Sequence, residues 1–428
     1  METPWSDPAI RAAFDTDFRA LIEFAQGSRV DTGFGYLTDD GGVDTDRPVE
    51  LWITCRMTHV FSLAHMYGIL GCAQLAEHGI RSLRTAFHDN EYGGWHSAIG
   101  HHYGESGQAS VEGNGRKEAY AHAFVVLAAA SAYAAGIDGA QELLDDALAD
   151  QEEHWWEPEF GRVRESWDRK YGESEAYRGL NANMHTVECY LAAYDVTGDR
   201  LWLDRTRGIL RFVYDLGQEW EWRLPEHFDQ QWNVIPSYNE DKPADPFRPY
   251  GTTPGHAFEW ARLMLHVRAA LVDAGDEIGD WMIEGAWHLF NRATRDAWDT
   301  NIGGLIYTTD YDGTPIVRER MHWVLCEAVG AAVILGKTLD YEGGHDGWVS
   351  ALSTDFATWV AWADQKLHEG QGRWRHELAP DNTPGSRTWS GKPDAYHVAQ
   401  MLLLPRLPVA PGFAVSLRDG LLAPLTAV

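Results

Sequence analysis

Residues 117–136, KEAYAHAFVVLAAASAYAAG, put small and apolar side chains on nearly every face of a helix. A helix of this kind has to be enclosed by other elements, because a helix at the surface of a protein carries a polar face. Its most apolar part, residues 123–136, is too short to cross a bilayer. We therefore predict a buried helix in the interior of a globular fold.

Five further stretches along the chain have the same character. The starts of successive stretches lie roughly 65–75 residues apart, a spacing that indicates an internal repeat. The five stretches are residues 50–71, 183–198, 253–275, 321–336 and 393–407. The sequence thus predicts six buried helices, one in each repeat.

Two other kinds of segment separate the buried helices. Residues 7–25, 200–217 and 279–298 carry apolar side chains at i, i+3, i+4 and i+7, the pattern of an amphipathic outer helix. Segments rich in glycine and aromatic residues are predicted to form short β-hairpins. These segments are residues 33–41, 91–100, 159–166, 302–313 and 370–382.

Six alternating pairs of one buried and one amphipathic helix predict an all-α fold, an (α/α)6 barrel with short β-hairpins in its loops. The inner helices of a closed ring are covered on all sides, which their composition requires. The alternative is an open α-solenoid, whose terminal repeats should be polar caps. The sixth stretch, residues 393–407, is as apolar as the others, so we expect a closed barrel formed by one domain, residues 1–428.

The composition excludes several classes of partner. The 35 Lys and Arg against 64 Asp and Glu give a formal net charge of −29, which repels phosphate backbones and anionic lipid. We therefore expect neither nucleic acid nor a membrane as a partner. The four cysteines are scattered and form no CxxC pair, and the start METPWSDPAI has no signal-peptide pattern. A cytoplasmic location is the resulting expectation.

Polar residues gather at the starts of the six buried helices, which converge at one end of such a barrel. The set comprises Trp52, Arg56, His59, Tyr120, Asn181, His185, Glu188, His256, Glu259, His322, Glu327, Tyr396 and His397. His185/Glu188 and His256/Glu259 have the i, i+3 spacing that places a carboxylate beside an imidazole. Such a carboxylate fixes the tautomer of the ring and prepares it as a general acid or base. A single helical histidine is more often structural, so it is the set that indicates catalysis.

Aromatic residues provide a second signal, because the chain has 20 Trp. Flat apolar faces beside polar groups suit a sugar ring, which stacks through its C–H face and hydrogen-bonds through its hydroxyls. Six tryptophans lie in loops or helix starts predicted to surround the cavity. They are Trp52, Trp95, Trp232, Trp323, Trp374 and Trp389. The alternative for each is simple packing of a hairpin on an outer helix.

Four separated motifs resemble the N-acylglucosamine 2-epimerase superfamily, and most of all its branch of mannose and sulfoquinovose isomerases. The motifs are ELWITCRMTH (50–59), NANMHTVE (181–188), TPGHAFEW (253–260) and KPDAYH (392–397). The resemblance implies an (α/α)6 barrel that moves a proton at C2 of an aldose through a cis-enediol or enediolate. It implies no metal and no cofactor, and a monosaccharide as the substrate.

The resemblance also implies roles for individual residues. His256 and His397 match the acid/base pair. Our hypothesis is that His256, held by Glu259, opens the pyranose ring and shuttles the oxygen proton while His397 moves the carbon proton, and the two roles could be exchanged. The remaining matches are substrate-binding groups. Arg56, Trp52, Asn181, His185, Glu188 and Glu259 match most closely, and Tyr120, His322 and Glu327 less so. The residues of these motifs resemble the mannose isomerase branch more than the 2-epimerases. The resemblance therefore favours interconversion of D-mannose and D-fructose.

Other functions stay open from the sequence. The same two histidines would serve a sugar 2-epimerase, and Arg248 is a candidate cation for the sulfonate of sulfoquinovose. A glycoside hydrolase would need two carboxylates flanking the scissile bond, with Glu188, Glu259 and Glu327 as the candidates. A metal-dependent isomerase and a non-catalytic sugar-binding protein complete the alternatives.

Overall fold

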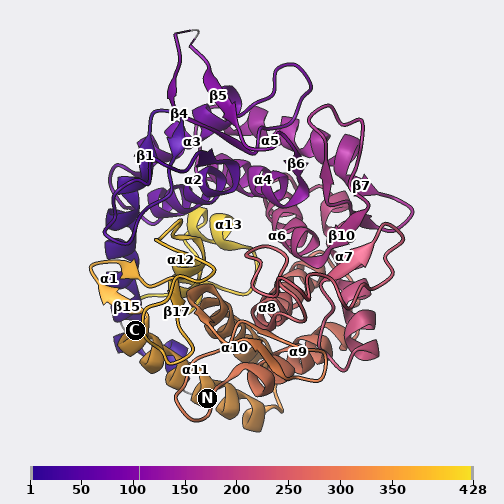
Figure 1. Ribbon diagram of the computed structural model, residues 1–428. Helices are drawn as coiled ribbons and strands as arrows, with labels where there is room; N and C mark the ends of the chain where they lie inside the picture. Colours follow the sequence, from indigo (N-terminus) through magenta and orange to yellow (C-terminus); the bar gives the residue numbers. More distant parts are fainter. Residues whose placement is uncertain (1–2, 106, 426–428) are drawn as a thin grey trace.

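The computed structural model, which describes residues 3–105 and 107–425, has a ring of helices at its centre (Figure 1). Each inner helix packs against the next, and the last packs against the first, so the ring is closed. The inner helices are α2 (Leu51–Met66), α4 (Ala119–Ala134), α6 (Leu180–Thr197), α8 (Pro254–Asp273), α10 (His322–Glu342) and α12 (Tyr396–Leu403). They coincide with the six predicted buried stretches.

An outer layer of helices surrounds this ring. In chain order, α3, α5, α7, α9 and α11 pack on α2, α4, α6, α8 and α10, and α1 packs on α12. The outer helices are α1 (Pro8–Ala25), α3 (Cys72–Thr85), α5 (Ala140–Asp150), α7 (Arg200–Glu219), α9 (Trp281–Ala297) and α11 (Asp346–Lys366). The sixth pair thus joins the first helix to the twelfth, and the predicted alternation is confirmed.

Burial explains why the inner helices are apolar all round. In α4, 14 of the 16 residues are buried, and its alanines let α2 and α6 approach closely on either side. Among the described residues, α10 alone is long and apolar enough to span a bilayer. It lies in the ring with 89% of its most apolar window buried, as a core helix would.

Short strands precede most inner helices and fix where each helix begins. The pairs are β3 (Val49–Glu50) with β4 (Ala98–Tyr103), β6 (Lys117–Glu118) with β9 (Ser166–Trp167), β10 (Tyr177–Gly179) with β11 (His227–Asp229), and β14 (Arg320–Met321) with β17 (Glu377–Leu378). A bridge between Thr252 and Thr309 does the same before α8. Backbone hydrogen bonds therefore hold the inner helix starts at one end of the barrel.

The remaining short elements lie in the loops. β1 (Arg29–Val30) pairs with β2 (Gly33–Phe34), β7 (Trp156–Glu157) with β8 (Arg162–Val163), β12 (Thr308–Thr309) with β13 (Pro315–Val317), and β15 (His368–Gly370) with β16 (Arg373–Trp374). These hairpins overlap or adjoin four of the five predicted segments. The fifth segment, residues 91–100, instead enters a three-stranded sheet in which β5 (Ala109–Glu112) flanks β4.

Irregular helices and a terminal helix complete the molecule. The short 3-10 helices Pro4–Ser6 and Gln26–Ser28 flank α1, and a π-helical turn, Gln151–Trp155, extends α5. The helix α13 (Phe413–Arg418) packs against α2, α4 and α6. It helps to close the barrel at the end opposite the inner helix starts.

Candidate active site

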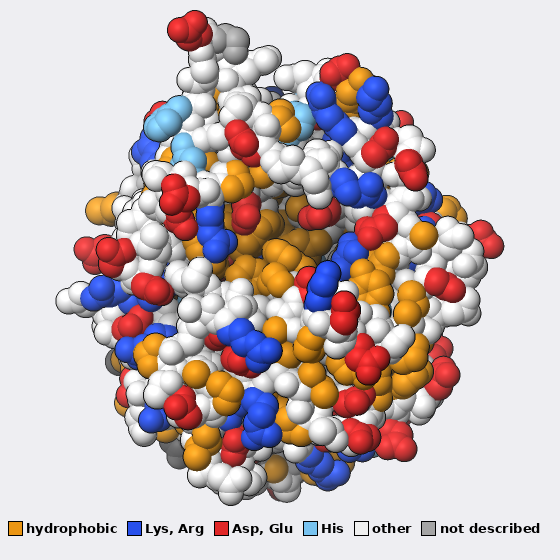
Figure 2. Space-filling model, in the orientation of Figure 1, with side chains coloured by type: hydrophobic (Ala, Val, Ile, Leu, Met, Phe, Trp, Pro, Cys, Tyr) orange, Lys and Arg blue, Asp and Glu red, His pale blue; other side chains and the backbone are white. Residues whose placement is uncertain are grey.

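A pocket opens at the end of the barrel where the inner helices begin. Figure 2 shows this hollow at the centre of the face, walled by hydrophobic side chains and surrounded by charged ones. It encloses about 650 Å³ of empty space, its open mouth included. The lining residues are Trp52, Arg56, Tyr120, Asn181, His185, Pro246, Phe247, Pro249, His256, Glu259, Tyr307, His322, Trp323, His376, Trp389, Pro393, Asp394 and His397. All six inner helices or the loops before them contribute.

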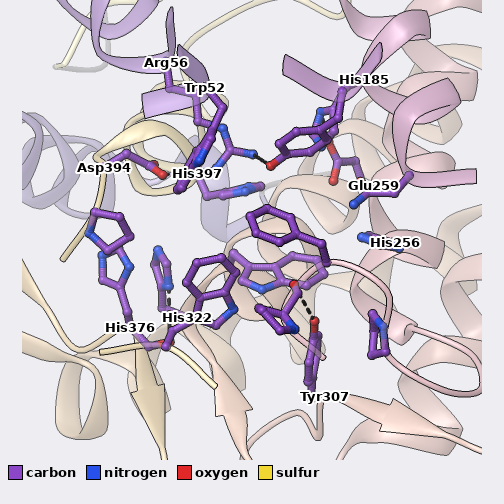
Figure 3. A pocket seen from close by; sticks show the side chains of 18 residues that line it. Trp52, Arg56, His185, His256, Glu259, Tyr307, His322, His376, Asp394 and His397 are labelled. Atoms are coloured by element: carbon purple, nitrogen blue, oxygen red, sulfur yellow. Dashed lines mark hydrogen bonds and ion pairs between the residues drawn. The ribbon is translucent and has the colours of Figure 1, made fainter. Parts of the chain in front are cut away.

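His256 lies at the start of α8, two residues after Pro254, and faces the pocket (Figure 3). Its Nδ1 lies 3.0 Å from Glu226 Oε1. A carboxylate accepts, so the ring donates from Nδ1 and Nε2 is left for a ligand. The prediction that Glu259 holds His256 is wrong, because the partner comes from the loop before β11 and not from the same helix.

Gly255 makes room for this arrangement. A Cβ atom at residue 255 would lie 2.4 Å from the Trp323 ring, closer than any real contact. The missing side chain lets α8 approach the start of α10, and the Trp323 ring lies 5.2 Å from the ring of His256. The same indole lies 5.8 Å from the ring of His397. Trp323 thus brings both histidines to one aromatic surface.

His397, near the start of α12, is the second imidazole of the pocket and is also held by a carboxylate. Its Nδ1 lies 2.9 Å from Glu327 Oε1, and the other oxygen of Glu327 accepts from Arg262 Nε at 2.9 Å. Burial lowers the pKa of His397, and the bond to Glu327 offsets only part of this shift. At neutral pH the ring is therefore uncharged and can accept a proton at Nε2.

Arg56, on α2, provides the positive charge of the pocket. Its guanidinium donates to Asp394 Oδ2 at 3.1 Å and to the Tyr120 hydroxyl at 2.9 Å. Burial alone would lower the pKa of Arg56, but Tyr120, Asp394 and Tyr396 raise it above its usual value. The guanidinium carbon also lies 5.1 Å from the centre of the Trp52 ring. A permanent cation in this position can stabilise negative charge on a bound oxygen.

His185 and Glu188 form the predicted pair on α6, with Nδ1 3.5 Å from Oε2. Burial lowers the pKa of His185 to about 4. Glu188 accepts from the Tyr396 hydroxyl and, at 2.9 Å, from Gln400 Nε2. Glu188 thus lies behind the wall of the pocket, and so does Glu327, while His185 lines it.

The same region carries the donor set that most resembles a metal site. One ligand atom each from His185, Glu188 and Glu259 lies within 4.8 Å of the other two. Tyr396 and Gln400 already occupy the oxygens of Glu188. The guanidinium of Arg262 lies 3.5 Å from Glu259 Oε1, so a cation is already present. These residues therefore fit a divalent ion poorly.

Several polar atoms of the lining are buried without a hydrogen-bond partner in the described part of the chain. They are Arg56 Nε, Asn181 Oδ1, both Glu259 oxygens, His322 Nε2 and Trp389 Nε1. Leaving a buried polar group unpaired costs about 1–3 kcal/mol, so this wall is suited to a ligand with many hydroxyls. Burial and the neighbouring Glu327 raise the pKa of Glu259 well above its usual range, so its carboxyl can also donate.

Only three of the six tryptophans that were predicted to surround the cavity do so. Trp52, Trp323 and Trp389 line the pocket. The other three are wrong: Trp95 is buried against His122, Trp232 packs in the loop near Phe212, and Trp374 lies beside His368. Trp95 donates to the Leu83 carbonyl of the outer helix α3 at 2.9 Å, and Trp232 packs on Phe212 of α7, which was the alternative interpretation. Trp374 packs within its own hairpin.

Arg248 does not reach the pocket. Its guanidinium donates to both oxygens of Glu175, at 2.8 and 3.0 Å, and its carbon lies 4.1 Å from the centre of the Tyr177 ring. A contact with Glu165 at 3.5 Å completes its surroundings. Within the described residues, Arg56 is the only Lys or Arg of the lining. The predicted sulfonate-binding role for Arg248 is therefore not supported by its position.

Several residues of the site were not predicted from the sequence. Asp394 lies within the KPDAYH motif, three residues before His397, so the motif could have suggested it. Glu226, Phe247, Tyr307 and His376 come from loops. The His376 ring lies 3.7 Å from that of His322, and burial lowers the pKa of His322 to about 3. Loop residues carry no helical period that would place them in the pocket.

Comparison with known proteins gives relatives over almost the whole chain. A D-mannose isomerase of Thermobifida fusca is 45% identical over 423 residues, which cover 97% of this chain and 99% of that protein. A D-mannose isomerase of Pseudomonas cannabina pv. alisalensis is 42% identical, over 92% of each chain. A crystal structure of a D-mannose isomerase superposes with a TM-score of 0.81 at 24% identity, over 95% of this chain and 99% of the other.

The superposition confirms the predicted barrel, because it extends over nearly every element of both chains. The family profile for N-acylglucosamine 2-epimerase (GlcNAc 2-epimerase) matches residues 33–401, which include five inner helices and all but the last two residues of α12. The chain therefore belongs to the N-acylglucosamine 2-epimerase family.

Proposed function

We propose that the protein is an aldose–ketose isomerase that interconverts D-mannose and D-fructose. The observation that carries the proposal is the pair of histidines, His256 and His397, each held at Nδ1 by a buried carboxylate and both facing the same pocket. The identity to the two D-mannose isomerases supports the choice of substrate. Arg56 and the unpartnered polar atoms of the wall provide the contacts for the sugar oxygens.

The reaction moves two hydrogens and needs no oxidant. On the open-chain sugar, Nε2 of His397 removes the C2 proton, the electrons of that bond form the C1–C2 double bond, and those of the C1 carbonyl move to O1. The free Nε2 of His256 takes the O2 proton and passes it to O1, so that O2 becomes the carbonyl of the ketose. His397 then returns its proton to C1. Arg56 stabilises the charge that develops on the enediol oxygens.

The charge of the pocket favours a neutral sugar. An anionic group at C6 would need an unpaired cation, and Arg56 already binds Asp394 while Arg248 binds Glu175. An unmatched charge in a buried site is strongly unfavourable. We therefore propose an uncharged hexose, with sulfoquinovose as the alternative that the assay has to exclude.

The proposal is tested with chelator-treated protein and D-mannose deuterated at C2, with the products identified by chromatography and mass spectrometry. Fructose with deuterium partly retained at C1 and partly lost to solvent is the expected result, because one imidazole carries the label. Full retention would indicate a hydride shift, and loss of activity with chelator would indicate a metal. Glucose as the product would make the enzyme a 2-epimerase. Turnover of sulfoquinovose but not of mannose would reject the proposed substrate.

A further inference from the structure

Arg262 is a buried cation directly beneath the pocket that has no place among the lining residues. It follows Glu259 by three positions on α8, and only 2% of its side chain is exposed. It lines instead a second cavity, together with His59, His266 and Phe413 of α13. The guanidinium thus lies between the two cavities, outside the lining of the first.

The contacts of Arg262 join it to His397 through one carboxylate. Arg262 Nε donates to Glu327 Oε2 at 2.9 Å, and His397 Nδ1 lies 2.9 Å from Glu327 Oε1. An ionised Glu327 accepts at both of these oxygens, whereas a protonated one would donate from one of them. The tautomer of His397 depends on this state, because a protonated Glu327 would offer a donor to Nδ1.

Other charged groups crowd the same space. Glu259 Oε1 lies 3.5 Å from Arg262 Nη2, and Glu188, Tyr396 and His266 also face the guanidinium. Without the charge of Arg262, the three buried carboxyl groups of Glu188, Glu259 and Glu327 would compete for protons. With it, Arg262 and His397 outweigh burial and lower the pKa of Glu327, whereas Glu259 keeps its proton.

We propose that Arg262 is a positioning residue: it keeps Glu327 ionised and thereby fixes His397 with its proton on Nδ1 and its lone pair on Nε2, in the pocket. The proposal rests on the isomerase function proposed above, in which His397 is the carbon base. Arg262 is not a lining residue of the pocket, so its bond to Glu327 is the route by which it acts on His397. Its ion pair with Glu259 is a separate contact.

The test compares R262Q and R262K with the matched control R268Q. Arg268 lies on the same helix and pairs with Glu342 at 2.8 Å, away from the pocket. We expect R262Q to lower kcat on mannose about 100-fold, the size of a general-base effect, with KM changed less than about 3-fold. R262K keeps the positive charge but lacks the planar, forked donors of the guanidinium, so its kcat should be about a tenth of that of the original protein. R268Q should keep the kcat of the original protein.

Two further readouts separate positioning from structural damage. In the double variant R262Q/E327Q, kcat should be close to that of E327Q alone, because both changes break the same series of hydrogen bonds from Arg262 through Glu327 to His397. Side-chain ¹⁵N spectra of the unliganded protein should show His397 protonated at Nδ1, and this signal should shift in E327Q and R262Q. The spectra need no turnover, so they test Arg262 even if mannose is not the substrate.

A kcat for R262Q equal to that of the original protein would overturn the proposal. So would single effects that multiply in the double variant, or an unchanged Nδ1 signal. If R262Q fails to fold, R262K and E327Q decide the matter through the same spectra and the same KM-against-kcat comparison.

Discussion

The contact between Glu226 and His256 leads to a direct test of how His256 works. Glu226 lies outside the lining of the pocket, and its carboxylate accepts from His256 Nδ1 at 3.0 Å. We expect E226A to lower kcat on mannose and to leave KM unchanged within about 3-fold, because the sugar contacts the ring and not the carboxylate.

The magnitude follows from this single bond. A hydrogen bond to a charged group contributes about 1.5–3 kcal/mol, and every 1.36 kcal/mol corresponds to a factor of ten in rate. The loss in E226A should therefore be about 10- to 150-fold. E226Q keeps a neutral acceptor, so about 10-fold is expected. The assay is initial-rate formation of fructose over a range of mannose concentrations.

A matched control distinguishes this effect from the removal of any buried carboxylate. Glu319 is buried on the same side of the barrel and accepts from Arg387 at 2.8 Å, but it is not a lining residue. E319A should have kcat close to that of the original protein. E226A with kcat within 2-fold of the original, or with a loss confined to KM, would refute the role of Glu226.

Three further changes test other parts of the site. G255A adds a Cβ against the Trp323 ring and should lower the free energy of unfolding by about 1–3 kcal/mol, measured by urea denaturation; unchanged stability would contradict the close contact. D394N leaves the buried charge of Arg56 uncompensated and should cost about 3–5 kcal/mol in stability and raise KM, whereas a thermal midpoint like that of the original protein would argue against the pair. Burial lowers the pKa of His397, so the imidazole is uncharged at any pH above about 6.5, the usual pKa of histidine. We therefore expect log kcat/KM to fall only below about pH 6.5, and a fall beginning above about pH 7 would reject His397 as the base.

The barrel could be predicted because its helices repeat one physical requirement. A stretch such as residues 117–136 has no polar face, so it must be enclosed, and six such stretches at a regular spacing specify a ring. The same regularity placed His185, His256 and His397 at one end. It carried no information about how each ring is oriented.

The orientation of the histidines depends on residues that no period connects. The i, i+3 rule favoured Glu259 as the partner of His256, but Glu226 reaches the ring from a loop held by β11. Glu327 is likewise on a different helix from His397. Long-range pairs of this kind follow from tertiary packing, so only the structure could reveal them. Trp95 shows the same limit, since its indole donates to the Leu83 carbonyl of the outer helix α3.

The pairing of α1 with α12 has a consequence for how the protein is made. A ribosome delivers α1 first and α12 after five complete helix pairs, so α1 can contact α2 early but waits for α12, on which it packs more extensively. Contacts between such distant segments are slow to form. His397 lies on that late helix, so the histidine proposed as the carbon base joins the pocket only when the two ends of the ring meet. Until then the growing chain exposes an apolar seam, and exposed surface of this kind is prone to aggregation.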